Sequence, residues 1–484
     1  MSPVRTFKRT KVVITLGPAT DDPNIMDELI LAGANVARVN FSHGSTDDQI
    51  RRVAQVRASA ARVGRSVGIL GDLSGPKIRI DRFVDGFIEL VAGAPFTIDL
   101  SLAADAGTVS SVGCSYKALA SDVEPGAILL LNDGLIVLEV VRVEGPRVLT
   151  RVISGGRLSN NKGLNRRGGG LSAGALTEKD RQDIPIAAKL AVDYLAVSFP
   201  RSVADIEEAR ALMRAAGGHA RLMAKIERTE AITHLESIVT ASDAVMVARG
   251  DLGIEVGDAA LMGLQKQIIA SARRHNKIVV TATQMMESMI DSPIPTRAEV
   301  SDVANAVLDG TDAVMTSAET ASGKYPVETI EAMNRICIEA EKSQPVSLDQ
   351  DFLNRVFQRV DQSIAMAALF TAFHLKVKAI ASLTESGSTA LWMSRLNCGV
   401  PIYALTAQTT TRYRCSLFRD TYPLVVKYVG DDREELLAEA ERVLVENGVV
   451  QEGDLIVLTI GEPIGKPGGT NTMKIVRVGD RAKV

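Results

Sequence analysis

Short apolar strands alternate with amphipathic helices along most of the chain, and this repeat constrains the fold more than any other feature. Eight runs rich in valine, isoleucine and leucine have the length of buried strands: Val12–Leu16, Val36–Val39, Val67–Leu70, Tyr194–Val197, Arg221–Ala224, Ala244–Val247, Ile278–Thr281 and Ala313–Met315. Amphipathic segments separate most of them: Asn24–Ala32, Asp47–Val63, Glu178–Leu190, Val203–Met213, Glu230–Val239, Ala259–Arg274, Arg297–Leu308 and Val327–Ala340. Thr177-x-x-Asp180 and Thr296-x-x-Glu299 give two of these helices capping-type starts. Near-continuous apolar strands that alternate with helices are typical of a parallel sheet buried on both faces, so the sequence predicts an α/β fold with a (β/α)8 TIM barrel.

The repeat is interrupted once and then ends before the chain does. Between about Ile78 and Ser172 the segments IRIDRF, FIEL, FTIDL, AILLL, LIVLEVV and RVLTRV predict an antiparallel β insertion without a helix, placed where a lid over the barrel belongs. After Gln344, helices near Phe352–His374 and Arg433–Glu446 and the strands KAIASL, PIYALT, DLIVLTI and TMKIVRV predict a smaller α/β domain. We therefore expect a barrel domain in two parts (1–77 and 173–344), an inserted all-β lid domain (78–172) and a C-terminal α/β regulatory domain (345–484).

Charge and cysteine usage exclude several classes of partner. A net charge of −3 argues against nucleic acid or an anionic membrane held by bulk charge. The apolar run VVITL near the N-terminus is too short for a signal peptide or a membrane span. The four cysteines lie far apart without a CxxC pair, which indicates free thiols in a reducing compartment, so we expect a cytoplasmic enzyme.

Six of the eight predicted strands end in, or are directly followed by, polar side chains, where a barrel of this type carries its chemistry. They are Arg38 and Asn40, Asp72, Lys225 and Glu227, Arg249, Gly250 and Asp251, Thr281 and Thr283, and Ser317 and Glu319. The alternative is that these side chains only face solvent at the mouth of the barrel. The number of cations, carboxylates and hydroxyls at these positions favours an active site.

Lys225, Glu227 and Asp251 carry the most specific chemistry. Lys225 and Glu227 are two residues apart on an extended segment, so their side chains point to one side and could form only a structural ion pair. With Asp251 at the next strand end, Glu227 and Asp251 instead suit a largely hydrated Mg²⁺ or Mn²⁺, and Lys225 stays free to meet a phosphoryl group or an enolate. His43 is open to two interpretations, a base or a structural hydrogen-bonding group. No P-loop is present.

Nine motifs in order along the chain resemble those of pyruvate kinase. They are TLGPAT (15–20), ARVNFSHG (37–44), GDLSGPKIR (71–79), NNKG (160–163), LTEKD (176–180), AKIER (224–228), ARGDLG (248–253), TATQMMESM (281–289) and TSAETASGKYP (316–326). The resemblance implies transfer of the phosphoryl group of phosphoenolpyruvate to ADP, giving pyruvate and ATP at the last step of glycolysis.

The resemblance also implies a role for each matching residue. Arg38 would hold the substrate phosphate, Lys225 would stabilise the transferring group and the enolate, and Gly250, Asp251 and Thr283 would complete the substrate pocket. Glu227 and Asp251 would bind Mg²⁺ or Mn²⁺. Arg79 and Lys162 would bind the ADP phosphates, with Asn40 and His43 assigned to the nucleotide as well, and Ser317 and Glu319 would order proton delivery.

One departure from the family pattern concerns the monovalent cation. Many members bind K⁺ through an Asn, a Ser, an Asp and a Thr, within a motif reading DTKGPEIR. Asn40, Ser42 and Asp72 remain here as a vestigial K⁺ site, but Leu73 replaces the Thr and Lys77 replaces the Glu. This resembles the K⁺-independent branch, in which a lysine ammonium takes the cation's place, so we expect that K⁺ is not required. The alternative is that Lys77 points into solvent and K⁺ still binds.

A hydroxyl-rich turn in the third domain is a candidate effector site. Thr384, Ser386, Gly387, Ser388 and Thr389 join a strand to a helix, and amides and hydroxyls at such a turn can hold a phosphate. The simpler interpretation is an N-cap with solvated hydroxyls. The resemblance places an allosteric site for a sugar phosphate or nucleoside monophosphate there, and it suggests a homotetramer.

Two other functions use the same scaffold. A barrel lyase or aldolase acting on a pyruvate-like enolate would use the lysine and the metal carboxylates, but it would need neither Arg79, Lys162 nor the lid. A non-catalytic sensor would keep the effector site, but the intact Lys225, Glu227, Asp251 and Thr283 argue against it.

Overall fold

Eight strands hydrogen-bond into a closed barrel in the order β1-β16-β15-β14-β13-β12-β3-β2. They are β1 (Lys11–Thr15), β2 (Val36–Asn40), β3 (Gly68–Asp72), β12 (Tyr194–Val197), β13 (Arg221–Ile226), β14 (Ala244–Ala248), β15 (Ile278–Ala282) and β16 (Ala313–Met315). Every residue of β1, β3, β12, β14, β15 and β16 is buried, because one face of each strand fills the barrel and the other meets helices. The predicted fold class is confirmed, and each strand lies within two residues of its predicted bounds.

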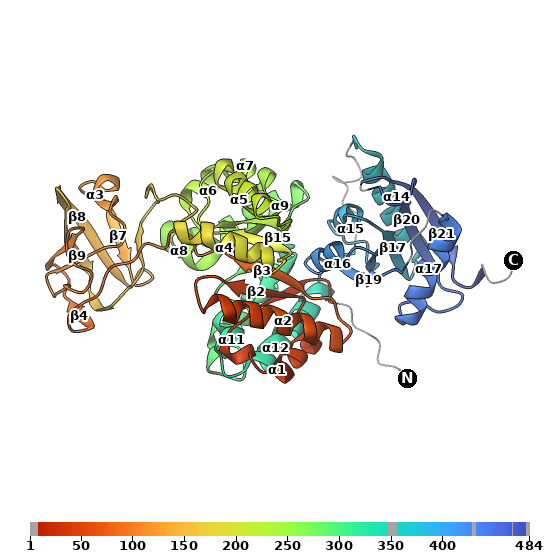
Figure 1. The fold of residues 1–484 in the computed structure, drawn as a ribbon, viewed down its shortest axis with the longest axis horizontal. Coiled ribbons are helices and arrows are strands. Elements are labelled where there is room, and N and C mark those ends of the chain that lie inside the picture. Colours follow the sequence, from red (N-terminus) through yellow and green to blue (C-terminus); the bar gives the residue numbers. More distant parts are fainter. Residues whose placement is uncertain (1–7, 347–355, 428–431, 467, 481–484) are drawn as a thin grey trace. The chain divides into compact units, whose positions relative to one another are not determined.

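The computed structural model describes residues 8–346, 356–427, 432–466 and 468–480 (Figure 1). The described residues divide into two compact units, one within 1–71, 190–195 and 272–484 and one of 72–189 and 196–271. Both units contribute strands to the barrel. The predicted boundaries at 77/78, 172/173 and 344/345 stay predictions.

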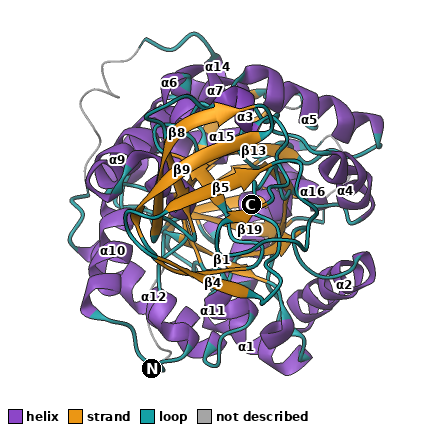
Figure 2. Cartoon of the chain, turned by 90° about the vertical axis from the view of Figure 1, so that its left-hand side faces the viewer, coloured by secondary structure: helices purple, strands orange, loops and turns teal. Residues whose placement is uncertain are grey.

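The helices between barrel strands follow the predicted pattern. They are α1 (Pro23–Ala32), α2 (Thr46–Arg62), α4 (Glu178–Lys189), α5 (Val203–Ala215), α6 (Thr229–Thr233), α7 (Leu235–Ala241), α9 (Asp258–Arg274), α10 (Arg297–Leu308) and α12 (Pro326–Lys342). Both predicted capping boxes form, since Thr296 Oγ1 accepts from Glu299 N at 3.3 Å and Thr177 Oγ1 accepts from Asp180 N at 3.1 Å. Helices α1, α2, α10 and α12 lie outside the strands (Figure 2).

Two helical segments differ from the prediction. The predicted helix Glu230–Val239 is interrupted at His234, which ends α6 and precedes α7. Two further helices directly follow strands, α8 (Arg249–Val256) after β14 and α11 (Ala318–Ala321) after β16. Asp251 and Glu319 therefore lie in helical turns and not on extended strand ends. Short 3-10 turns, η1 (Pro18–Thr20) and η2 (Glu287–Ile290), complete this part of the chain.

The inserted segment forms mainly antiparallel β structure with its own core, as predicted; only β5 and β6, among its named strands, pair in parallel. A six-stranded sheet has the order β11-β7-β8-β9-β5-β6, and β10 pairs with β4. The strands are β4 (Phe87–Leu90), β5 (Pro95–Asp99), β6 (Ser111–Val112), β7 (Ile128–Leu131), β8 (Ile136–Glu144), β9 (Arg147–Ser154), β10 (Gly156–Ser159) and β11 (Leu164–Arg166). Two details of the prediction are wrong. A one-turn helix, α3 (Leu119–Asp122), is too short to show a helical period, and IRIDRF makes only isolated bridges because it runs between the barrel and the sheet.

The C-terminal domain has a five-stranded sheet in the order β19-β18-β17-β20-β21, drawn in blue in Figure 1. The strands are β17 (Ala379–Leu383), β18 (Ile402–Thr406), β19 (Thr421–Val425), β20 (Leu455–Gly461) and β21 (Thr470–Arg477), and only the β20–β21 pair is antiparallel. The helices are α14 (Val360–Leu375), α15 (Ser388–Met393), α16 (Thr409–Cys415) and α17 (Arg433–Glu446). The start of the predicted helix Phe352–His374 lies outside the described residues.

All four cysteines are buried and free, as the sequence predicts. In the described ranges, no helix has the length and apolar character that a transmembrane segment requires.

Candidate active site

The ammonium of Lys225 lies among three oxygen-bearing side chains at the ends of neighbouring strands. Lys225 Nζ is 3.0 Å from Glu227 Oε1 and 3.3 Å from Asp72 Oδ1, and it donates to Ser198 Oγ at 2.7 Å. The side chains of Glu227 and Asp72 are each only 1% exposed, so these contacts form almost out of water. The predicted pairing of Lys225 with Glu227 on one side of the segment is therefore present, and Asp72 joins it.

Glu227 occupies an unusual environment for a carboxylate. Its Oε2 accepts a hydrogen bond from Phe199 N at 2.8 Å, and Phe199 has a left-handed backbone with φ 54°. Burial raises the pKa of Glu227 to about 7; the ammonium of Lys225 opposes this rise, and the carboxylates of Asp251 and Asp72 add to it. A carboxyl poised near neutral pH inside a barrel mouth is characteristic of functional sites.

Asp251 and Gly250 lie in the first turn of α8. The leading amides of a helix have no partner within it and attract negative charge, so this turn suits an anionic group of a substrate. The ammonium of Lys77 is 3.5 Å from Asp251 Oδ1, and the two side chains are 43% and 24% exposed. Lys77 therefore faces Asp251 and does not point only into solvent.

Two positioning residues were missed by sequence reasoning. Ser198, at the end of β12, accepts from Lys225 and donates to Leu73 O at 2.7 Å, so it links the lysine to the loop that carries Lys77. Asp180, which is fully buried, accepts from Gly75 N at 3.1 Å in the same loop. Gly75 has φ +65°, and a Cβ there would lie 2.6 Å from the Ser198 Cβ, so the loop needs glycine at this point. The motif LTEKD contains Asp180, but its role in holding the Gly75 loop is visible only from the hydrogen bond with Gly75 N.

Arg38 and its neighbours lie at the end of β2, in the other compact unit. Arg38 Nη1 donates to Thr15 Oγ1 at 3.1 Å, which fixes the guanidinium beside β1. Asn40 accepts from Ser42 N at 3.0 Å, and His43 N donates to Asn40 O at 3.2 Å, so Asn40 organises the turn that follows.

Thr283, Ser317 and Glu319 follow β15 and β16 in that same unit. Thr283 and Gln284 have left-handed backbones with φ of 66° and 53°, a conformation that is costly for a β-branched residue and gathers at functional sites. Glu319 accepts from Ser317 N at 2.6 Å and from Met286 N at 3.2 Å, and burial raises the pKa of its carboxyl. Its carboxylate therefore ties the turn after β16 to the turn after β15.

Arg79 and Lys162 lie on two adjoining segments where the chain enters and leaves the lid. Arg79 pairs with Gly163 in an isolated antiparallel bridge, and Ile80 N donates to Lys162 O at 2.9 Å. Arg79 is exposed, and its Nη1 donates to Asn161 O at 2.8 Å. Two segments from distant parts of the sequence, each with a cationic residue, thus adjoin through their backbones.

The carboxylates around Lys225 fit a hard divalent cation. Three of them, Asp72, Glu227 and Asp251, adjoin the ammonium groups of Lys225 and Lys77, and burial raises the pKa of Glu227 to about 7. The described residues contain no group of three or more His, Cys, Asp and Glu arranged to hold a metal. In proteins, Mg²⁺ is usually bound by one or two carboxylates, and oxygens of water and substrate complete its coordination.

Comparison with known proteins gives the family. A family model described as pyruvate kinase, barrel domain, matches residues 7–330, and one described as pyruvate kinase, alpha/beta domain, matches residues 362–476. Pyruvate kinase II of Salmonella typhimurium is 51% identical over 478 residues, covering 98% of this chain and 99% of that protein. The chain belongs to the pyruvate kinase family.

Other members of the family differ in identity and length. Pyruvate kinase of Haemophilus influenzae is 51% identical over 463 residues, covering 94% of this chain and 96% of that protein. Pyruvate kinase of Geobacillus stearothermophilus is 39% identical over 480 residues, covering 98% of this chain but 81% of that protein. The family is generally dependent on a metal ion, in keeping with the carboxylates around Lys225.

The hydroxyl-rich turn of the C-terminal domain borders a cavity of about 350 Å³. Thr384 Oγ1 accepts from Gly387 N at 2.9 Å, Ser386 Oγ donates to Ser388 Oγ at 3.2 Å, and Gly387 begins α15 with φ +80°. Thr389 is buried and shares a hydrogen bond of 2.7 Å with Thr470. Lys466, in the loop after β20, also lines this cavity.

Proposed function

We propose that this chain transfers the phosphoryl group of phosphoenolpyruvate to ADP, with Lys225, Glu227 and Asp251 at the reacting centre. The observation that carries the assignment is the contact of Lys225 with Glu227 and Asp72, 3.0 and 3.3 Å long, beside the helical turn that holds Asp251. The family motifs ARVNFSHG and TATQMMESM support adding Arg38 and Thr283 to this centre.

For this reaction the protein has to position the two substrates and neutralise the negative charge of their reacting groups. The bond between the phosphorus and the enol oxygen breaks, and a new bond forms from the phosphorus to a β-phosphate oxygen of ADP. Arg38 holds the phosphoryl group, and the amides of Gly250 and Asp251 hold the substrate carboxylate. Lys225 faces the negative charge that develops on the enolate oxygen, and its short contacts hold the ammonium in place before the substrate arrives.

Glu227 and Asp251 hold Mg²⁺ or Mn²⁺, which supplies further positive charge to substrate oxygens when it is bound. Arg79 and Lys162 hold the phosphates of ADP, with Asn40 and His43 near the nucleotide. Their place at the two ends of the inserted segment supports a lid that carries nucleotide contacts and excludes water when it closes.

The enolate must then gain a proton on its methylene carbon to become pyruvate. Ser317 and Glu319 order the donor, which is water in our proposal. The buried carboxyl of Glu319, held by two backbone amides, supports a role in fixing that water. Thr283 adds a hydroxyl to the same turn region.

An assay coupled to lactate dehydrogenase tests the function directly. With phosphoenolpyruvate, ADP and Mg²⁺, the chain should produce pyruvate at a rate proportional to its concentration. A barrel lyase or aldolase would form no pyruvate that depends on ADP, and a non-catalytic sensor would form no pyruvate. Lys324→Met is the matched control for Lys225→Met, because Lys324 is an exposed lysine paired with an exposed Asp291. Normal activity in Lys225→Met would exclude the assignment.

Lys77 supplies the unit charge that K⁺ supplies elsewhere in the family. Its ammonium contacts Asp251 Oδ1 at 3.5 Å, which supports a position beside the metal and the substrate phosphate. Leu73 is 1% exposed, and its aliphatic side chain cannot bind K⁺ as the hydroxyl of a Thr would.

A pair of titrations tests this. At constant ionic strength, the wild type should run at full rate with Na⁺ or tetramethylammonium as the monovalent ion and respond little to KCl. Leu73→Thr combined with Lys77→Glu should lose activity and regain part of it with K⁺. Several-fold activation of the wild type by K⁺ would contradict the role of Lys77.

The cavity beside α15 binds a phosphorylated activator, a sugar phosphate or a nucleoside monophosphate. Ser388 and Lys466 line this cavity and support a phosphate at this end, and Ser386 Oγ donates to Ser388 Oγ at 3.2 Å. Ser386→Ala with Ser388→Ala should abolish activation and leave maximal activity largely intact, since coupling is an energy separate from catalysis. A normal response of the double variant would place the activator elsewhere.

The chain assembles as a cytoplasmic homotetramer. Exposed apolar side chains on α14 support a contact between copies through the C-terminal domain, since Val360, Phe370 and Leu375 are 64%, 48% and 48% exposed. Light scattering should give four times the chain mass, and Phe370→Glu should reduce it.

A further inference from the structure

Three buried threonines meet where β1 and β16 end. The hydrogen-bonded ladder between the two strands stops at the pair of Val13 and Met315. Beyond it, Thr320 Oγ1 accepts from Thr15 N at 3.0 Å and donates to Thr15 O at 3.1 Å. Thr320 Oγ1 also shares a hydrogen bond of 3.0 Å with Thr316 Oγ1. The side chain of Thr320 therefore takes the place of a strand partner for the last residue of β1.

The hydroxyl of Thr15 orients the guanidinium group of Arg38. A hydroxyl carries one proton, and Thr15 Oγ1 donates its proton to Thr316 O at 2.7 Å. Its lone pairs then accept from Arg38 Nη1 at 3.1 Å. A guanidinium group binds phosphate best through two parallel hydrogen bonds, and these form only when its plane has the right direction. Because Thr15 is 4% exposed, it is a fixed support for that plane.

Thr320 belongs to α11, the one-turn helix that also carries Glu319. The carboxylate of Glu319 accepts from Ser317 N at 2.6 Å, so Ser317, Glu319 and Thr320 form one turn. This turn packs closely on the chain that follows β1, because a Cβ on Gly17 would lie 2.3 Å from Ala321 O. The two hydrogen bonds of Thr320 with the backbone of β1 therefore anchor the turn to which we assign proton delivery.

We propose that Thr15 and Thr320 are positioning residues of the phosphoryl transfer. Thr15 fixes Arg38 for the substrate phosphate, and Thr320 fixes the turn of Glu319 to the same residue of β1. The inference rests on the proposed function, in which Arg38 holds the phosphoryl group and Glu319 orders proton delivery. All four residues belong to one compact unit. Phosphate binding and protonation of the enolate thus depend on one pair of buried hydroxyl groups.

Isothermal titration of the full-length chain with Mg²⁺ present tests the role of Thr15. Thr15→Val replaces the hydroxyl by a methyl group, and it should weaken binding of phosphoenolpyruvate about tenfold because Arg38 loses its support. Binding of ADP should change less than twofold, and so should binding of pyruvate, which has the same carbon skeleton but no phosphate. Thr15→Ser keeps the hydroxyl and should restore the binding of phosphoenolpyruvate. Thr15→Ala replaces Thr15→Val if that variant does not fold.

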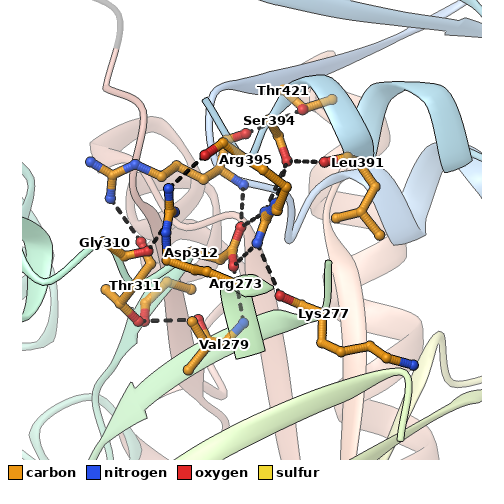
Figure 3. A network of polar contacts seen from close by, with 12 residues as sticks. Arg273, Lys277, Val279, Gly310, Thr311, Asp312, Leu391, Ser394, Arg395 and Thr421 are labelled. Atoms are coloured by element: carbon orange, nitrogen blue, oxygen red, sulfur yellow. Dashed lines mark hydrogen bonds and ion pairs between the residues drawn. The ribbon is translucent and has the colours of Figure 1, made fainter. Parts of the chain in front are cut away.

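Two comparisons separate positioning from a general loss of stability. Thr311→Val is the matched control, because Thr311 is also a buried threonine, two residues before β16, and its hydroxyl donates to Val279 O at 3.1 Å (Figure 3). It should lower stability in urea but leave the binding of phosphoenolpyruvate unchanged. In kcat/KM for phosphoenolpyruvate, the effects of Arg38→Ala and Thr15→Val should not add, since Thr15 acts through Arg38.

Proton exchange tests the role of Thr320. Exchange of the methyl protons of pyruvate with D2O, followed by nuclear magnetic resonance, measures formation and protonation of the enolate without phosphoryl transfer. Thr320→Val should slow this exchange about tenfold because the turn of Glu319 loses its anchor, and Thr320→Ser should restore it. Thr15→Val should change the exchange less than twofold, since the backbone of Thr15 still pairs with Thr320.

Three results would overturn the proposal while the proposed function stands. The first is normal binding of phosphoenolpyruvate by Thr15→Val. The second is an effect of Thr15→Val that adds fully to that of Arg38→Ala. The third is normal proton exchange in Thr320→Val. Failure of the proposed function would be seen in the wild type itself, which would then bind no phosphoenolpyruvate or form no pyruvate from it, and the inference would fall with it.

Discussion

The ionisation of Glu227 should control metal binding across the physiological pH range. Burial raises the pKa of this carboxyl from 4.5 to about 7. A divalent ion binds the ionised form, so below pH 7 a proton must leave before the metal can bind. At pH 5 only about 1% of such a group is ionised.

The apparent affinity for Mn²⁺ should therefore rise roughly 100-fold between pH 5 and pH 8, about tenfold per pH unit up to pH 7 and little above it. A carboxyl with its ordinary pKa of 4.5 would give a rise of only about 1.3-fold over the same range. The free Mn²⁺ signal in electron paramagnetic resonance, recorded without substrate, measures this affinity directly.

Two variants separate Glu227 from the other groups of the site. Glu227→Gln should bind Mn²⁺ weakly and without the steep pH dependence. Asp251→Asn should also bind weakly, but it should keep the slope, since Glu227 still has to lose its proton. A wild-type affinity that changes less than threefold from pH 5 to pH 8 would refute the reasoning.

Lys225→Met should lower kcat by on the order of 10²–10³ with little change in KM, because it removes a charge used mainly in the transition state. Ser198→Ala should lower kcat by about tenfold and shift its pH profile, whereas Ser198→Thr keeps the hydroxyl between Lys225 and Leu73 O and should restore most of the rate. Arg395→Ala should lower the free energy of unfolding by about 3–5 kcal/mol, since it leaves Asp312 buried and unpaired. Urea unfolding followed by the fluorescence of Trp392, the single tryptophan, measures this loss.

Most of the barrel could be predicted because its strands are short, apolar and buried on both faces. Ile278–Thr281, for example, has no polar residue before Thr281, and the structure extends this strand by only one residue. The helix α8 was not predicted, because ARGDLGIEV contains two glycines and no apolar period. Its last turn is held by a contact with a residue distant in the sequence, since Glu255 accepts a hydrogen bond from Thr229 N at 2.9 Å.

The sequence predicts those site residues whose side chains are reactive or charged and whose spacing fixes their direction. A lysine and a carboxylate two apart on an extended segment had to face one another, and Lys225 and Glu227 do. Ser198 and Asp180 could not be found in this way, because a serine and a capping aspartate are common, and their importance comes from what they touch. The assignments of substrate, metal and activator stay predictions for the experiments above.

The ion pair of Arg395 with Asp312 has a consequence for how this chain could be divided or recombined. Asp312 belongs to the barrel, and its counter-ion arrives from the C-terminal domain, with both side chains almost fully out of water at 1% and 0% exposure. A barrel produced without that domain would keep a carboxylate with no counter-charge, and a C-terminal domain taken from a relative would have to bring an arginine at the same place. The two parts are therefore not interchangeable modules, and a working chimera must transfer both partners of this pair together.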